Sequence, residues 1–167
     1  MGARFWPVSR RSRPKQLLPL ASDRPLIVDT MDRARLLAPD ERIRILAGAH
    51  LSEPFGTVLP ELAPDALLVE PQARGTAPVL AWAAWLLHRQ DPDAVMVSLH
   101  ADHMIRGDDA FRELLVEAVA LARQEDALVT VAVEPTRPET GYGYIELGEP
   151  VEVAGDVEAY RVASFIE

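Results

Sequence analysis

Positive charge is concentrated in the first sixteen residues of a chain that is acidic as a whole. This segment has no acidic residue and five cations (Arg4, Arg10, Arg11, Arg13 and Lys15), whereas the 167-residue chain has a formal net charge of −9. Such a segment needs a nearby anion, which is either a bound ligand or the protein's own carboxylates. Lys15 is the only lysine in the chain, and its compact ammonium suits a phosphate oxygen. A disordered basic arm is the alternative, although the aromatic residues Phe5 and Trp6 count against it.

A second group of reactive side chains follows the apolar segment 94–99. Asp102 stands where a buried strand would end, and a carboxylate there can hold Mg²⁺ against substrate phosphates. An aspartate that only caps the following loop is the structural alternative. His100, Asp102 and His103 together also read as a transition-metal cluster, because imidazole and carboxylate suit zinc or iron. Two histidines without any ligand role are a further reading.

A third group lies in segment 70–78, which joins an apolar run to an apolar helix. Thr76 is a plausible N-cap, and Pro78 is tolerated in the first turn of a helix. The free amides of that turn would face any ligand lying over the sheet. A helix start with a purely structural role is equally consistent with this pattern.

The last group is the glycine-rich segment 134–146. Gly141 and Gly143 flank a tyrosine, which by itself indicates a tight turn before a strand. A glycine such as Gly143 also allows a ligand to approach the backbone closely.

These groups fall at the junctions of an alternating series of strands and helices. We expect helices at 24–37, 50–62, 76–90 and 109–123, and strands at 42–47, 66–69, 94–99 and 128–133. Near-continuous apolar strands alternating with helices predict an α/β fold, a mostly parallel sheet with helices on both faces. Helix 76–90 is apolar nearly all round and is expected to be buried, and the sequence after Pro135 predicts a β-rich continuation. In such sheets ligands bind beyond the carboxyl ends of the strands.

Composition limits the remaining possibilities. Hydrophobic content of 49% with 26% charged residues is typical of one soluble globular domain. The chain has no cysteine, which excludes disulfides, thiolate metal sites and cysteine nucleophiles. The net acidity argues against nucleic-acid binding. The longest apolar run is too short to span a bilayer and no secretory signal is recognisable, so we expect a cytoplasmic protein.

Taken together, these segments resemble the signature motifs of the mannose-1-phosphate guanylyltransferases, a branch of the sugar-nucleotide pyrophosphorylases. Segment 2–16 resembles the motif Gly-Gly-x-Gly-Thr-Arg-Phe-Trp-Pro-x-Ser-Arg followed by Pro-Lys-Gln, and 70–78 resembles Glu-Pro-x-x-Arg-Asn-Thr-Ala-Pro. Segment 99–103 resembles Leu-Pro-x-Asp-His, 136–145 resembles the sugar-contacting loop, and 165–167 resembles the start of Phe-x-Glu-Lys-Pro. The chain departs from the motifs at Ala3 in place of Thr, Gly75 in place of Asn and His100 in place of Pro.

The resemblance implies a Rossmann-like fold and a Mg²⁺-dependent reaction in which GMP passes from GTP to mannose 1-phosphate, giving GDP-mannose and pyrophosphate. It implies catalytic roles for Arg4 and Lys15 on the triphosphate, and it makes Asp102 the ligand of Mg²⁺. The implied nucleotide-binding residues are Gly2, Arg4, Lys15, Glu70, Arg74, Thr76 and Ala77. The implied sugar-binding residues are Gly143, Tyr144 and Glu167.

Against the family's pattern, residues 1–167 are expected to form a partial nucleotidyltransferase domain without its first strand and its C-terminal part. We expect such a chain alone to be poorly soluble or molten, because an open sheet edge leaves backbone groups unpaired. Three alternatives stay open: a related enzyme for another sugar or base, a longer protein with a phosphomannose isomerase module, and a non-catalytic or inert fragment. The expected partners are GTP and mannose 1-phosphate, without nucleic acid or membrane, and a homo-oligomer stays open.

Overall fold

The computed structural model describes residues 14–153, 155 and 157–166 of the chain. The chain divides into two compact units, residues 1–108 and 109–167, which are described separately. Among the described residues, no helix combines the length and the apolar character needed to cross a membrane.

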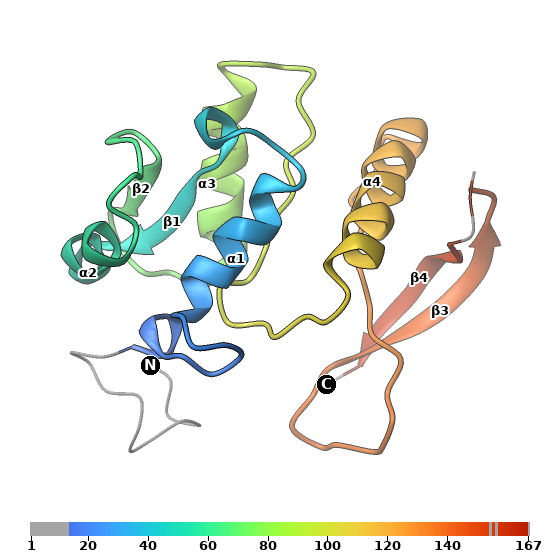
Figure 1. The fold of residues 1–167 in the computed structure, drawn as a ribbon. Helices are drawn as coiled ribbons and strands as arrows, with labels where there is room; N and C mark the ends of the chain where they lie inside the picture. The colour runs from blue at the N-terminus through green and yellow to red at the C-terminus, as the bar shows by residue number, and fades with distance from the viewer. Residues whose placement is uncertain (1–13, 154, 156, 167) are drawn as a thin grey trace. The chain divides into compact units, whose positions relative to one another are not determined.

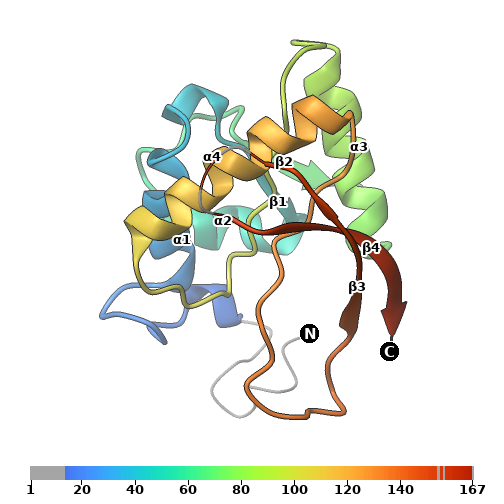
Figure 2. The same cartoon turned by 90° about the vertical axis from the view of Figure 1, so that its right-hand side faces the viewer.

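The first unit is built around a pair of parallel strands, β1 (Ile45–Gly48) and β2 (Leu67–Glu70). The register places Ile45 beside Leu67 and Gly48 beside Glu70, so both strands end at the same edge of the sheet. Helices α1 (Leu26–Arg35) and α2 (Ser52–Val58) lie on one face of this pair and α3 (Thr76–His88) on the other (Figures 1 and 2). The described residues of this unit also form three short 3-10 helices, η2 (Lys15–Leu17), η3 (Asp40–Arg42) and η4 (Ala49–Leu51).

The core of the first unit lies between β1 and the helices α1 and α2. Alternate residues of β1, Ile45 and Ala47, are buried, as expected for a strand with one face against a core. They form one cluster with Ile27 and Met31 of α1 and with Phe55 of α2, which is 2% exposed. Helix α2 is shorter than the predicted 50–62, because a residue that precedes proline is disfavoured in helical conformation. The residue before Pro60 is correspondingly non-helical, with φ −129° and ψ 65°.

Helix α3 is less buried than its apolar composition predicts. Among its residues, all of which the structure describes, only Ala83 is buried, and Trp85 on another face is 54% exposed. The guanidinium of Arg89 lies over the Trp85 ring, 5.0 Å from its centroid. A helix that packs on a sheet buries one face only, so the prediction of a fully buried helix is wrong.

The second unit consists of helix α4 (Asp108–Glu125) and an antiparallel pair of strands, β3 (Tyr144–Val151) and β4 (Ala159–Ile166) (Figure 1). Arg161 of β4 forms an ion pair with Glu125 at the end of α4. The β-rich continuation predicted after Pro135 is confirmed.

The predicted α/β fold class is confirmed, with a parallel strand pair covered on both faces by helices. The strands predicted at 94–99 and 128–133 are wrong, because neither segment is assigned regular structure. A strand requires a hydrogen-bonded neighbour, and neither segment pairs with another strand within the described residues. Apolar side chains in both segments, including Met96 and Val129, are correspondingly exposed.

Candidate functional site

The basic segment and the predicted metal-binding carboxylate meet in the first unit. The ammonium of Lys15 pairs with Oδ2 of Asp102, although 87 residues separate the two along the chain. Lys15 begins the η2 turn, which is anchored by Leu17 against the core and by the buried side chain of Leu18. The two charged side chains remain 29% and 23% exposed, so a ligand can reach both of them.

The loop that carries Asp102 is held from two sides. Ala101 packs against the core cluster of α1, β1 and α2. The buried Arg33 of α1 donates hydrogen bonds from Nη2 to the backbone carbonyl of His103, at 3.1 Å, and to Oγ1 of Thr30, at 3.0 Å. No sequence motif indicated Arg33. The available signal was its helical spacing, seven residues after the buried Leu26, which puts an arginine on the buried face of α1.

Two histidines lie beside Asp102. His100 and His103 stack with their ring centroids 4.9 Å apart, and each of the three residues offers one ligand atom within 4.8 Å of the others. Desolvation by neighbouring groups, followed by the charges of His100, Lys15 and Arg33, lowers the pKa of the exposed His103 below its ordinary 6.5, while the Asp102 carboxylate acts in the opposite direction. The lowered pKa favours the neutral form of the His103 imidazole.

The carboxyl ends of β1 and β2 form a second part of the site. A Cβ atom added to Gly48 would lie 3.0 Å from the ring of His50 and 3.8 Å from Oε1 of Glu70, so these two side chains approach the same point above the sheet. Glu70 is half-buried. The guanidinium of the exposed Arg74 donates from Nε and Nη2 to Oε1 of Gln72, at 3.2 and 3.0 Å.

Helix α3 begins at Thr76, and Gly75 occupies the N-cap position without a side-chain cap. The prediction of Thr76 as the N-cap is wrong by one residue. The reason is that Gly75 turns the chain with φ 97° and ψ 176°, a backbone conformation that is almost exclusive to glycine. Thr76 and Ala77 are exposed in the first turn, where a helix has amides without intrahelical acceptors.

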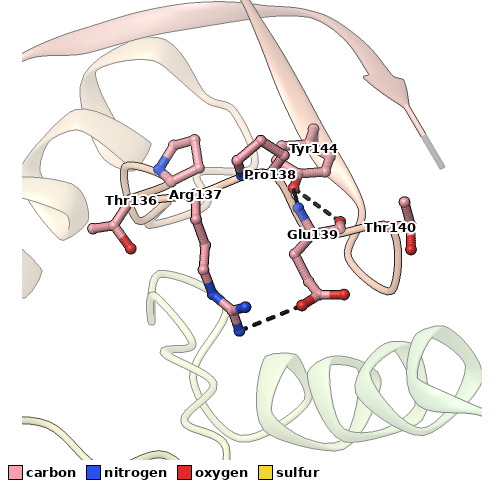
Figure 3. A pocket seen from close by; sticks show the side chains of 7 residues that line it. Thr136, Arg137, Pro138, Glu139, Thr140 and Tyr144 are labelled. Carbon is pink, nitrogen blue, oxygen red and sulfur yellow. Dashed lines mark hydrogen bonds and ion pairs between the residues drawn. The ribbon is translucent and has the colours of Figure 1, made fainter.

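In the second unit, the predicted sugar loop lines an open surface pocket of about 580 Å³ (Figure 3). The Tyr144 hydroxyl donates to the carbonyl of Glu139 at 2.9 Å and accepts from its N–H at 2.8 Å, which closes the loop on itself. Arg137 points toward the Glu139 carboxylate, 3.4 Å away, from the same side of the loop. Gly143 is exposed, so the neighbouring backbone is open to a ligand.

The predicted site residues are thus distributed over both units. Lys15 and Asp102 are in contact. The predicted nucleotide-binding residues Glu70, Arg74, Thr76 and Ala77 lie at the end of β2, in the loop that follows it and in the first turn of α3. Gly143 and Tyr144 belong to the second unit. Gly2, Arg4 and Glu167 lie outside the described residues.

Asp102 satisfies the chemical requirement for one ligand of Mg²⁺. Its carboxylate supplies hard oxygen atoms, it remains partly exposed, and Lys15 donates to Oδ2. Mg²⁺ commonly binds through one or two carboxylates while keeping several waters and contacting substrate phosphates.

Known proteins resemble this chain over most of its length. The sequence model of the nucleotidyl transferase family matches residues 1–167. Xanthan biosynthesis protein XanB of Xanthomonas campestris is 39% identical over 154 residues, covering 88% of this chain and 32% of that protein. Mannose-1-phosphate guanylyltransferase ManC of Salmonella typhimurium is 38% identical over 175 residues, covering 99% of this chain and 35% of that protein. The chain therefore spans about a third of the length of these curated relatives.

A solved structure is also similar. The crystal structure of mannose-1-phosphate geranyltransferase from Thermus thermophilus aligns with a TM-score of 0.81 and 33% sequence identity, and the alignment covers 98% of this chain and 46% of that one. At this similarity the two chains share their fold.

Proposed function

The chain belongs to the nucleotidyl transferase family, and we propose that it forms part of an enzyme that transfers GMP from GTP to mannose 1-phosphate, giving GDP-mannose and pyrophosphate. The contact between Lys15 and Asp102 is the observation that carries the proposal. Nucleotidyl transfer to a sugar phosphate requires a cation that neutralises phosphate oxygens and a carboxylate that holds a divalent metal ion. This contact brings together Lys15 for the first role and Asp102 for the second. The relatives named mannose-1-phosphate guanylyltransferase support the choice of substrates.

In the proposed reaction, an oxygen of the sugar phosphate attacks the α-phosphorus of GTP in line. The new P–O bond forms as the bond to the oxygen bridging the α- and β-phosphates breaks, and pyrophosphate leaves. No protein nucleophile is needed, so the contribution of the chain is to position the reactants and to stabilise charge. The ammonium of Lys15 would leave Asp102 to contact the triphosphate, where Arg4 and the backbone around Gly2 would assist it.

Asp102 would hold Mg²⁺, and the bound ion would neutralise charge on the phosphates. When Lys15 moves to the phosphates, its former partner Oδ2 becomes available as an additional ligand atom. Substrate binding would therefore replace the Lys15–Asp102 ion pair by two contacts, one between Lys15 and a phosphate and one between Asp102 and Mg²⁺.

We assign the nucleoside to the β2–α3 connection and the sugar to the loop of the second unit. The exposed first turn of α3, with Thr76 and Ala77, offers amides to the nucleotide, and the carboxylate of Glu70 and the guanidinium of Arg74 offer polar contacts. Gly143, Tyr144 and Glu167 would contact mannose. Because its hydroxyl is engaged with Glu139, Tyr144 would contact the sugar through its ring. The highly charged substrates are consistent with a reaction in the cytoplasm.

The test is pyrophosphate release by the full-length protein from GTP and mannose 1-phosphate. We expect Lys15→Ala to lower turnover by at least about a hundredfold, because a charge that stabilises the transition state is lost. Arg42→Ala is the matched control, since it removes an exposed cation from η3 and should retain wild-type turnover. Normal turnover of Lys15→Ala would remove Lys15 from the mechanism. Competition with ATP, CTP and UTP tests the choice of GTP, and nucleotide binding without pyrophosphate release would support a non-catalytic chain.

A further inference from the structure

The geometry points to a binding site for a divalent transition-metal ion such as Co²⁺ or Zn²⁺, with the side chains of His100, Asp102 and His103 as its ligands. This inference goes beyond the proposed nucleotidyl transfer, because it concerns an ion that binds in the absence of nucleotide and sugar. It also concerns a residue in which this chain differs from the family pattern it resembles, since that pattern has proline where this chain has His100.

The three ligand atoms are close enough to surround one ion. For atoms at most 4.8 Å apart, the central point lies no more than about 2.8 Å from each, whereas a zinc ion binds nitrogen and oxygen ligands at about 2.0–2.2 Å. Side-chain adjustments of less than about 1 Å therefore complete three bonds, with solvent available for a fourth. The two histidines are exposed and Asp102 is partly exposed, so an ion can enter from solvent.

The donor set selects the class of ion. Two imidazole nitrogens and one carboxylate oxygen suit zinc, cobalt and nickel, whereas Mg²⁺ prefers oxygen ligands only. The backbone that carries the ligands is already held in place, because the buried Arg33 donates to the carbonyl of His103 and Ala101 packs against the core. Little ordering of the loop is then needed when the ion binds.

The positive charge of Lys15 opposes binding of a metal cation to Asp102, and it should measurably lower the affinity of the site for the ion. Its ammonium occupies Oδ2 of Asp102, so an ion either uses Oδ1 beside Lys15 or displaces the ammonium. Either route costs electrostatic energy that a neutral side chain at position 15 would remove. A variant without this charge should therefore bind the ion more tightly than the wild type.

The experiment is a titration of the untagged, metal-free full-length protein with CoCl₂, followed by the visible absorption of protein-bound Co²⁺ and by calorimetry. We expect one equivalent of Co²⁺ to bind, and a large excess of Mg²⁺ to leave it in place. His100→Ala and His103→Ala should each weaken binding by at least about tenfold, since even loss of an outer partner of a metal ligand costs 10–100-fold. Lys15→Met should strengthen it. His88→Ala, which removes an exposed histidine at the end of α3, is the matched control and should bind as the wild type does.

Three results would overturn the inference: an absorption spectrum unchanged from that of aqueous Co²⁺, wild-type affinity in His100→Ala, or displacement of Co²⁺ by an equal concentration of Mg²⁺. Far-UV circular dichroism verifies that each variant is folded. If His100→Ala does not fold, His100→Gln replaces it, because glutamine keeps a polar side chain of similar length without an imidazole ligand.

Discussion

Arg33 of α1 donates a hydrogen bond of 3.1 Å to the backbone carbonyl of His103, which lies 70 residues further along the chain. Arg33 is 7% exposed, and its guanidinium also donates a hydrogen bond to Oγ1 of Thr30 in the same helix. A buried cation on the first helix thus fixes the loop that presents Asp102 to the candidate site.

Replacing Arg33 by methionine should destabilise the full-length protein by about 1–3 kcal/mol, because the carbonyl of His103 loses its hydrogen-bond donor. Urea denaturation measures this loss. Arg33→Lys keeps a positive charge but can supply only one flexible donor group, so it should fall between the wild type and Arg33→Met. Equal unfolding midpoints for all three proteins would show that this hydrogen bond does not hold the loop.

The core between β1, α1 and α2 depends on Phe55. Its side chain is 2% exposed, and Phe55→Ala should lower the free energy of unfolding by about 3–5 kcal/mol through lost burial and the cavity left behind. Phe165→Ala in β4 is the control, because Phe165 is 71% exposed and its truncation should change stability by no more than about 0.5 kcal/mol. Comparable losses in the two variants would place the core elsewhere.

Asp40 should titrate below its ordinary pKa of 3.8, because Arg35 hydrogen-bonds both of its carboxylate oxygens, at 2.9 and 3.0 Å. The folded state then releases this proton more readily than the unfolded state does. The pair with Arg35 therefore stabilises the folded state fully above pH 3.8, and this stabilisation is lost as the pH falls through the lower pKa that Asp40 has in the folded protein. Carboxyl-carbon NMR measures the titration, and Arg35→Gln should move the pKa of Asp40 back toward 3.8. An unchanged midpoint in Arg35→Gln would exclude the pair as the cause.

Local sequence patterns predicted those parts of the fold that depend on neighbours along the chain. The helices predicted at 24–37, 76–90 and 109–123 correspond to α1, α3 and α4, and the apolar runs before Gly48 and Glu70 located the parallel strands. An excess of cations on an acidic chain predicted a nearby anion for Lys15, and the structure places the carboxylate of Asp102 there.

The remaining features depend on contacts that the local pattern does not contain. Segments 94–99 and 128–133 have the composition of strands, but a strand forms only where another strand supplies hydrogen bonds. The role of Arg33 depends on a carbonyl 70 residues away. The sequence indicated that Arg33 shares a helix face with buried residues, but it contained no information about which distant group would approach that face.

The entrance to α3 depends on a glycine, and two glycine substitutions should have opposite effects. Gly75 has φ 97° and ψ 176°, a conformation almost closed to other residues, so Gly75→Ala should cost about 1–3 kcal/mol or displace the first turn of α3. Gly56 lies inside α2 with nothing within 4 Å of an added Cβ, so Gly56→Ala should stabilise the protein by about 0.5–1 kcal/mol. Urea denaturation shows whether each substitution lowers or raises the free energy of unfolding. The binding constant for GTP should fall in Gly75→Ala alone, because only Gly75 adjoins the amides assigned to the nucleotide. A stabilised Gly75→Ala, or weaker GTP binding in Gly56→Ala, would contradict this account of the β2–α3 connection.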